Sequence, residues 1–324
     1  MTVRQKNRLK KRAFGWGMSI LRTVFIGGLC FVVLYPLLTM LTSSVMSVSD
    51  IYDSSVNYIP KAFTLEHYVN AAKMLGYPSA LWNTLLMVAL VSVVQTCACT
   101  LVAYGFARYR FRLNGVLFGA VLVIMLIPPD VLMAPYFLQF RSFDLFGIVE
   151  AVTGEPLVLL DTYWPFILLG MTCTGLKNGL YIFIMRQYFR GVPKELRSAF
   201  ASIPTELEEA AYVDGAGPLK TLIRIILPGA VSMMVTVFLF SFVWQWLDEI
   251  YTPVLCGNMN VIPSTFGNLL NPFTNLTSVG DTMVLTGALL QDAGIVLVIF
   301  PLVLLYIAAQ KFFVQSMERS GLVG

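Results

Sequence analysis

The polar residues that could do chemistry in this chain lie inside long apolar stretches. Residues 244–249 (WQWLDE) place two indole rings, an amide and two carboxylates close together, and Asn178 lies in another apolar stretch. Aromatic rings combined with a few polar groups are typical of small-molecule sites, so Asn178, Gln245 and Asp248 are predicted contacts along a substrate path. Aromatic residues also gather at membrane interfaces and buried amides often join helices, so a structural role is the alternative.

The sequence shows no pattern of an enzyme or of a metal site. The single histidine is His67, and the cysteines are Cys30, Cys97, Cys99, Cys173 and Cys256. None of them has metal-ligand spacing, and we find no nucleophile–base pair. We expect His67 to be a solvated loop residue and the cysteines to be small buried side chains. A phosphate-binding loop of the Gly-x-x-x-x-Gly-Lys-Ser/Thr type is missing, so this chain is not expected to hydrolyse ATP or to bind a cofactor.

The composition predicts a membrane protein. Hydrophobic residues make up 57% of the chain and charged residues 12%, whereas a soluble domain averages about 25% charged residues. A helix that crosses the bilayer needs about 20 mostly apolar residues. Six segments meet this requirement, at residues 20–46, 80–107, 114–138, 163–188, 229–256 and 283–312.

The distribution of Lys and Arg predicts the orientation. Most of the 22 basic residues lie in the N-terminal segment 1–19, in the connections after the second and fourth spans, and near the C-terminus. Cytoplasmic connections carry this excess, so both termini are predicted to be cytoplasmic. The span 20–46 is too long for a signal peptide core and is expected to be retained. Within the third span, Pro128-Pro129-Asp130 is expected to break or bend the helix.

The connection between the fourth and fifth spans is about 40 residues long, which indicates a role of its own. Thr205-Glu206-Leu207-Glu208 fits a capping box that begins a helix. Gly215 suits the end of that helix and Pro218 the first turn of the next. These residues alone leave a solvated hairpin and a docking element equally possible.

The same connection carries a longer pattern, with these residues in order: Glu209, Ala210, Ala211, Gly215, Ile225, Leu227 and Pro228. Their types and gaps resemble the EAA loop of ABC importer permeases. Asp214 before Gly215 and the C-terminal stretch 313–324 resemble the carbohydrate-uptake branch, the relatives of maltose and glycerol-phosphate permeases. The resemblance covers residues 20–324. A repeated Pro-x-Glu-Leu, at 193–196 and 204–207, departs from the family pattern.

The resemblance implies an all-α polytopic membrane protein, an ABC type I importer permease with six transmembrane helices and a cytoplasmic coupling helix. The transmembrane domain would span 20–312 and include the EAA loop at about 193–228, followed by a cytoplasmic tail at 313–324. In such importers this loop seats in a cleft of the ATPase. By resemblance, Glu209 would contact the ATPase, Ala210 and Ala211 would permit a close approach, and Gly215 would form the elbow.

The resemblance also implies the partners and the location. We expect a second permease subunit, an ATPase dimer that holds ATP and Mg, an extracytoplasmic solute-binding protein, a sugar substrate and the lipid of the cell membrane. Nucleic acid is not an expected partner, because the basic residues lie in short segments between apolar spans.

Three alternatives to a sugar permease remain. A polyol, glycerol-phosphate or other small-solute permease would share the same motifs, although Lys177 is the one cation available for an anionic cargo. A stand-alone secondary transporter would show repeated halves, and the EAA pattern would then be unexplained. A membrane enzyme would need a catalytic constellation.

Overall fold

The computed structural model describes residues 3–53, 55–56, 58–145, 147–190, 218–267 and 281–319. These residues form no strand, and two isolated bridges pair Met46 with Phe63 and Phe143 with Leu157. The helices are α1 (Val3–Ser43), α2 (Val48–Ile51), α3 (Glu66–Leu75), α4 (Tyr77–Arg108), α5 (Asn114–Leu126), α6 (Pro129–Arg141), α7 (Ile148–Thr153), α8 (Trp164–Met171), α9 (Asn178–Arg190), α11 (Pro218–Thr221), the π-helix η2 (Leu222–Ile226), α12 (Leu227–Trp246), α13 (Tyr251–Leu255) and α15 (Asp281–Arg319). The predicted all-α class is therefore confirmed for the described part of the chain.

Four described helices are long and apolar enough to cross a membrane: Gly15–Ser43, Tyr77–Arg108, Leu227–Trp246 and Gly287–Gln310. The pair α5 and α6 passes the same test as one span bent by 99°. The predicted span 163–188 is not one helix, because α8 and α9 are separated at residues 172–177. The described residues thus contain four such helices, or up to five if the bent pair is one span.

The chain divides into two compact units, Met1–Met74 with Leu269–Ile299 and Leu75–Asn268 with Phe300–Gly324. In the first unit, the Ser43 hydroxyl at the end of α1 donates a hydrogen bond to the Asp292 carboxylate of α15. Most described side chains of α1 are exposed and apolar. Such a helix needs lipid or another protein around it.

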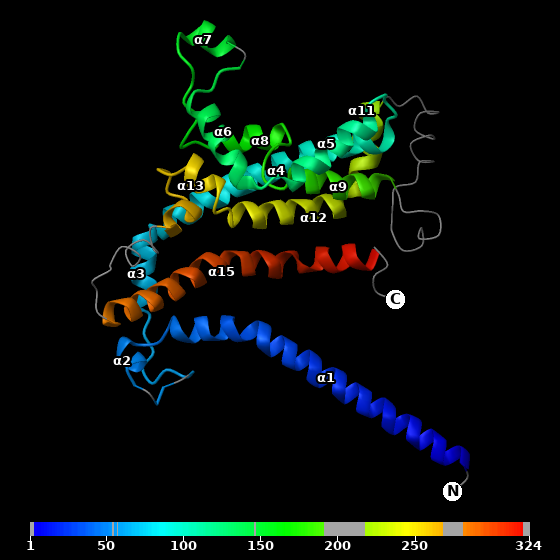
Figure 1. Cartoon of the computed structure of the whole chain (residues 1–324), viewed down its shortest axis with the longest axis vertical. Helices are drawn as coiled ribbons and strands as arrows, with labels where there is room; N and C mark the ends of the chain where they lie inside the picture. Colours follow the sequence, from blue (N-terminus) through cyan, green and yellow to red (C-terminus); the bar gives the residue numbers. More distant parts are fainter. Residues whose placement is uncertain are drawn as a thin grey trace. The chain divides into compact units, whose positions relative to one another are not determined.

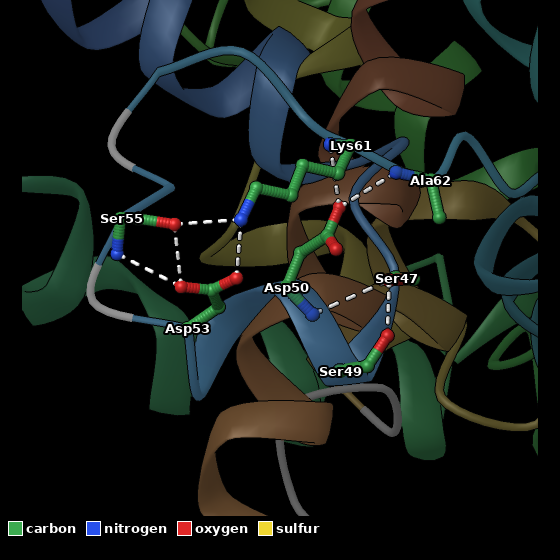
Figure 2. A network of polar contacts seen from close by, with 7 residues as sticks. All are labelled: Ser47, Ser49, Asp50, Asp53, Ser55, Lys61 and Ala62. Carbon is green, nitrogen blue, oxygen red and sulfur yellow. Dashed lines mark hydrogen bonds and ion pairs between the residues drawn. The ribbon is translucent and has the colours of Figure 1, made fainter.

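A polar network shapes the segment after α1 (Figure 2). The Asp50 carboxylate accepts the backbone N–H groups of Lys61 and Ala62, each at 2.9 Å, and the Lys61 ammonium pairs with Asp53. The Lys61 ammonium and the Ser55 hydroxyl hold the pKa of the Asp53 carboxyl well below its usual range. Each of these three charged side chains is therefore paired within the segment.

Two predictions about single residues are wrong. His67 is buried rather than solvated, with its Nε2 3.1 Å from the carbonyl oxygen of Met46. The chain folds back after α1 and covers this ring, which no local pattern indicates. Cys30 and Cys97 are exposed on α1 and α4 rather than buried, because an apolar helix surface that faces lipid accommodates a thiol as readily as a packed core does.

The second unit is built around α4. Helix α4 begins after Gly76, whose positive φ of 54° suits glycine, and it has a proline in its first turn. Helices α8, α9 and α12 pack against it, and α5 packs against α9 (Figure 1). The core is made by these side chains: Cys99, Ala103, Tyr104, Tyr181, Ile182, Met185, Phe189, Leu222, Ile226, Ala230 and Val237. These side chains come from α4, α9, η2 and α12.

Candidate functional site

The first interruption separates α5 from α6. Helix α5 ends at Leu126, and Pro128 and Pro129 begin α6. Proline has no N–H to continue the helical hydrogen bonds and its ring collides with the preceding turn. The prediction that Pro128-Pro129-Asp130 breaks or bends the third span is confirmed, with a bend of 99°.

The second interruption, at residues 172–177, separates α8 from α9. Cys173 and Lys177 adopt positive φ values of 57° and 60°, which side-chain-bearing residues rarely adopt. The backbone N–H groups of Thr174 and Gly175 both donate to the carbonyl oxygen of Leu169, each at 3.0 Å. These bonds replace the helical pattern and fold the chain back over the end of α8.

This second interruption lies against the middle of α4. A Cβ atom added at Gly175 would lie 2.9 Å from Nε2 of Gln95, and one at Gly170 would lie 3.2 Å from Cγ of the same residue. The Gln95 side chain in turn accepts a hydrogen bond of 2.5 Å from Ser241 on α12. Because Gln95 lies near the centre of α4, the interruption lies beside the middle of this long apolar helix.

Direct contacts hold the two interruptions together. The Tyr136 hydroxyl on α6 donates to the carbonyl oxygen of Thr174 at 3.0 Å, and its ring lies 5.6 Å from that of Tyr251. At the start of α9, a Cβ atom at Gly179 would lie 3.0 Å from the carbonyl oxygen of Val121 on α5. The glycine therefore permits α5 and α9 to approach closely beside both breaks.

A cavity of about 220 Å³ lies between the two interruptions. It is lined by Ile124, Met125, Leu126, Ile127, Pro128, Pro129, Leu132, Thr174, Gly175, Leu176, Lys177, Asn178, Gly179 and Tyr251. Ligand pockets usually measure about 300–1,000 Å³. A cavity of this size fits one ring or one polar group of a larger solute.

Among the predicted contact residues, Asn178 lines this cavity. Its side chain is 1% exposed, its Nδ2 lies 3.4 Å from the carbonyl oxygen of Leu169, and its Oδ1 is buried without a hydrogen-bond partner. The neighbouring Lys177 places its ammonium 5.5 Å from the centre of the Trp244 ring. The cavity lining thus includes a cation at Lys177, while Oδ1 of Asn178 is enclosed within the fold.

Gln245 and Asp248 lie away from the cavity lining, just before the N-terminus of α13. The Asp248 carboxylate accepts the backbone N–H groups of Ile250, Tyr251 and Thr252 and the hydroxyl of Thr252. Gln245 donates to the Thr252 hydroxyl at 3.4 Å. Neither residue is among those that line the cavity. Their observed bonds begin α13, and substrate contact stays a prediction for them.

The predicted coupling residues Glu209, Ala210, Ala211, Asp214 and Gly215 lie outside the described residues. The motif's last positions are described in part: Ile225 belongs to the π-helix η2, and Leu227 and Pro228 begin α12. Pro228 directly follows the π-helix, where the Leu227 N–H donates to the carbonyl oxygen of Leu222, so the proline lies where the α-helical hydrogen-bond pattern is already interrupted.

The described ends of this connection are joined. The Tyr188 hydroxyl, near the end of α9, donates to the carbonyl oxygen of Gly229 on α12 at 2.9 Å. Helix α9 therefore runs from the cavity lining, at Asn178, to Arg190, close to the start of the predicted coupling loop.

The sequence alone missed Tyr136, Thr174 and Tyr251 as residues of this site. The stretch 172–175 (TCTG) was averaged into an apolar span, although hydroxyl residues and glycine in succession are a local signal of a break. The Tyr136 contact had no local signal, because it joins residues 38 positions apart.

Comparison with known proteins identifies a family of transport proteins and several relatives of this chain. The family described as "Binding-protein-dependent transport system inner membrane component" matches residues 97–319, which contain both interruptions. A probable ABC transporter permease protein of Pyrococcus horikoshii is 26% identical over 286 residues, 88% of this chain and 90% of that protein. The arabinooligosaccharides transport system permease protein AraQ of Halalkalibacterium halodurans is 24% identical over 312 residues, 95% of this chain and 97% of AraQ.

A solved structure shows the same fold. The crystal structure of a bacterial ABC transporter involved in the import of the acidic polysaccharide alginate contains a similar chain, with a TM-score of 0.68 and 24% sequence identity. The alignment covers 94% of this chain and 98% of that chain.

Proposed function

This chain belongs to the family of inner membrane components of binding-protein-dependent transport systems, and we propose that it forms half of the translocation pathway for a sugar or oligosaccharide. It is a permease component of an ABC importer. The relative AraQ bears the name of an arabino-oligosaccharide permease, which supports the sugar class. The second half of the pathway would come from another permease subunit.

The observation that carries this proposal is the cavity between two interrupted helices. In secondary transporters, substrates bind near the bilayer midplane, where discontinuous helices turn backbone groups and helix ends toward the solute, and we propose the same use of broken helices in this permease. In this chain the α5–α6 and α8–α9 breaks meet at one cavity beside the centre of α4. Irregular backbone at this depth is tolerated where it lines such a space.

We propose six crossings with both termini in the cytoplasm. The bent pair α5–α6 and the interrupted pair α8–α9 would each make one crossing, beside the four continuous apolar helices. The distribution of basic residues supports this orientation.

Coupling to the ATPase would run through the EAA loop and α9. The loop follows the end of α9, and the first residue of α9 lines the cavity. A helix is stiff along its axis, so a displacement of the loop by an ATPase dimer, which holds ATP and Mg, would move the wall of the cavity. An extracytoplasmic solute-binding protein would deliver the cargo.

The test is reconstitution of the importer as it co-purifies with its partners. We expect a second permease and an ATPase to accompany the chain, and ATP-dependent uptake of a labelled saccharide into proteoliposomes. The variant Gly215→Val should insert normally but lose uptake and substrate-stimulated ATP hydrolysis. Gly115→Val is the matched control, because a Cβ atom there meets nothing within 4 Å. Full uptake by Gly215→Val would show that a glycine turn at this position is not needed for coupling.

The alternatives predict different results from the same preparation. A permease for a polyol or glycerol phosphate would bring the same partners but would transport those solutes instead of saccharides. A stand-alone secondary transporter would purify without an ATPase and would respond to an ion gradient.

A further inference from the structure

Cys99 and Cys173 bring two thiols together in the second unit. All five cysteines of the chain lie in the described residues, and these two form the one pair whose sulfur atoms lie in contact, 3.9 Å apart. A disulfide bond is about 2.05 Å long, so bond formation needs the two sulfur atoms to approach by about 1.9 Å, which a change of side-chain rotamer can supply. The pair is therefore close enough to be linked.

The two cysteines lie on segments that pack tightly against each other. Cys99 follows Gln95 by four residues on α4, so both side chains face the same side of this helix. Gln95 is the residue that Gly170 and Gly175 approach closely, and the sulfur atom of Cys99 lies 3.8 Å from the carbonyl oxygen of Asn178. One face of α4 thus contacts the second interruption from the end of α8 to the first residue of α9.

Cys173 has a backbone conformation that usually belongs to glycine. Its φ of 57° is in the left-handed region, where a residue with a Cβ atom is uncommon. Such residues persist where the surrounding structure determines them, and they cluster at active sites and switch regions. The Cys173 side chain is partly exposed, whereas Cys99 is buried. The pair therefore combines a thiol that a small oxidant can reach with a second thiol that is enclosed beside it.

We propose that Cys99 and Cys173 form a reversible disulfide bond when they are oxidised by hydrogen peroxide, and that this bond arrests import. The sulfur of Cys173 attacks one oxygen of the peroxide, the O–O bond breaks, and Cys173 becomes a sulfenic acid while the other oxygen leaves as water with the thiol proton. The sulfur of Cys99 then attacks that of Cys173. The S–S bond forms, the S–O bond breaks, and the hydroxide leaves as water with the proton of Cys99. The two thiols lose two electrons in total, and the peroxide takes them up. A dithiol reductant reverses the reaction by thiol–disulfide exchange.

The bond would fix the second interruption to α4. Residues 172–177 connect α8 with α9, and a few residues at the ends of elements are where hinge movements occur. In the proposed function, α9 transmits the displacement of the coupling loop to the wall of the cavity. The effect on import rests on that proposed function, whereas the disulfide itself depends only on the contact between the two sulfur atoms.

The first experiment detects the bond in the complete co-purified importer in proteoliposomes. The complex is treated with hydrogen peroxide, the remaining thiols are blocked with N-ethylmaleimide, and the digest is examined by mass spectrometry without reductant. We expect a linked pair of peptides that contain residues 99 and 173, lighter than the separate peptides by two hydrogen atoms, and we expect dithiothreitol to separate them. The matched control is Cys97→Ser, because Cys97 is an exposed cysteine of the same helix. This variant should keep the link, and Cys99→Ser should lose it. No link in the wild type, or a Cys173 sulfenic acid that stays unlinked, would overturn the inference.

The second experiment measures ATP-dependent saccharide uptake as the ratio of its values after and before peroxide. The wild type and Cys97→Ser should lose most of their uptake and recover it with dithiothreitol. Cys99→Ser and Cys173→Ser should keep theirs, because one thiol of the pair cannot form the bond. The ratio is taken within each preparation, so a variant with a lower starting uptake is still informative.

Two uptake results would overturn the arrest. One is full uptake by a wild-type complex in which the link has formed. The other is an equal loss of uptake in Cys99→Ser, which would place the oxidative damage at another cysteine or another subunit. If the wild-type complex imports no saccharide with ATP before oxidation, the proposed function itself fails, and the linked peptides still decide whether the pair forms.

Discussion

The segment after α1, at residues 47–62, and the cavity between the two interrupted helices both concentrate polar groups, but these groups have different partners. In the segment after α1, Lys61 pairs with Asp53, and Asp50 accepts two backbone N–H groups. At the cavity, Lys177 has no carboxylate partner among the described residues, and Oδ1 of Asn178 has no partner. Saturated polar groups shape a chain, whereas Lys177, a cation of the cavity lining, has no such partner in the described part of the chain.

The same contrast separates residues that the sequence grouped together. Asp248 and Asn178 were both predicted to contact substrate. Four hydrogen bonds from residues 250–252 occupy the Asp248 carboxylate, while Asn178 lines the cavity. Mutation of Asp248 should therefore lower stability, whereas mutation of Asn178 should lower transport.

The largest effect is expected at Gly179, on which the cavity's shape depends. A valine there would place its Cβ about 3.0 Å from the carbonyl oxygen of Val121 and would push α9 away from α5. Overpacking of this kind costs about 1–3 kcal/mol. We expect loss of uptake together with a lower melting temperature, measured by transport assay and by thermal unfolding in detergent. Gly115→Val should change neither, and normal uptake by Gly179→Val would show that this close approach is not required.

A smaller effect, on stability alone, is expected at Asp248. Asp248→Ala removes the acceptor for the first turn of α13 and leaves buried N–H groups without partners. Loss of such a cap costs about 0.5–2 kcal/mol. The melting temperature should fall, while the uptake affinity of the folded fraction should stay the same. A large loss of affinity with unchanged stability would instead place Asp248 in the substrate path.

The smallest effect is expected in the segment after α1, at the exposed pair of Asp53 and Lys61. Because the pKa of Asp53 is lowered in the folded state, the pair stabilises the fold above the carboxyl's unfolded pKa, and this contribution is lost as the pH falls through the lowered value. Asp53→Asn should lower the melting temperature slightly at neutral pH. The difference from wild type should vanish in strong acid, and uptake should be unaffected. A difference in melting temperature that does not change with pH would show that the stabilisation does not come from the charge of Asp53.

Local signals predicted part of the site. The Pro128-Pro129 break was predicted because proline itself removes the hydrogen bond that a helix needs. The break at residues 172–177 was not predicted, since Thr, Cys and Gly are all tolerated in a membrane helix, and the close approach of Gly170 and Gly175 to Gln95 joins distant segments. The burial of His67 was not predicted, because the ring contacts the carbonyl group of Met46, which lies 21 residues away in the sequence.

The sequence by itself determined that the chain is helical and apolar, where its long helices lie, and which loop pattern relates it to importer permeases. These properties depend on residue type and on spacing within one segment, so they can be read locally. Only the tertiary structure decided that the two breaks meet, that Asn178 rather than Gln245 or Asp248 lines the cavity, and that two cysteines of distant segments lie in contact. Such juxtapositions depend on which side chains of distant segments fit together in three dimensions, and no single segment contains that information.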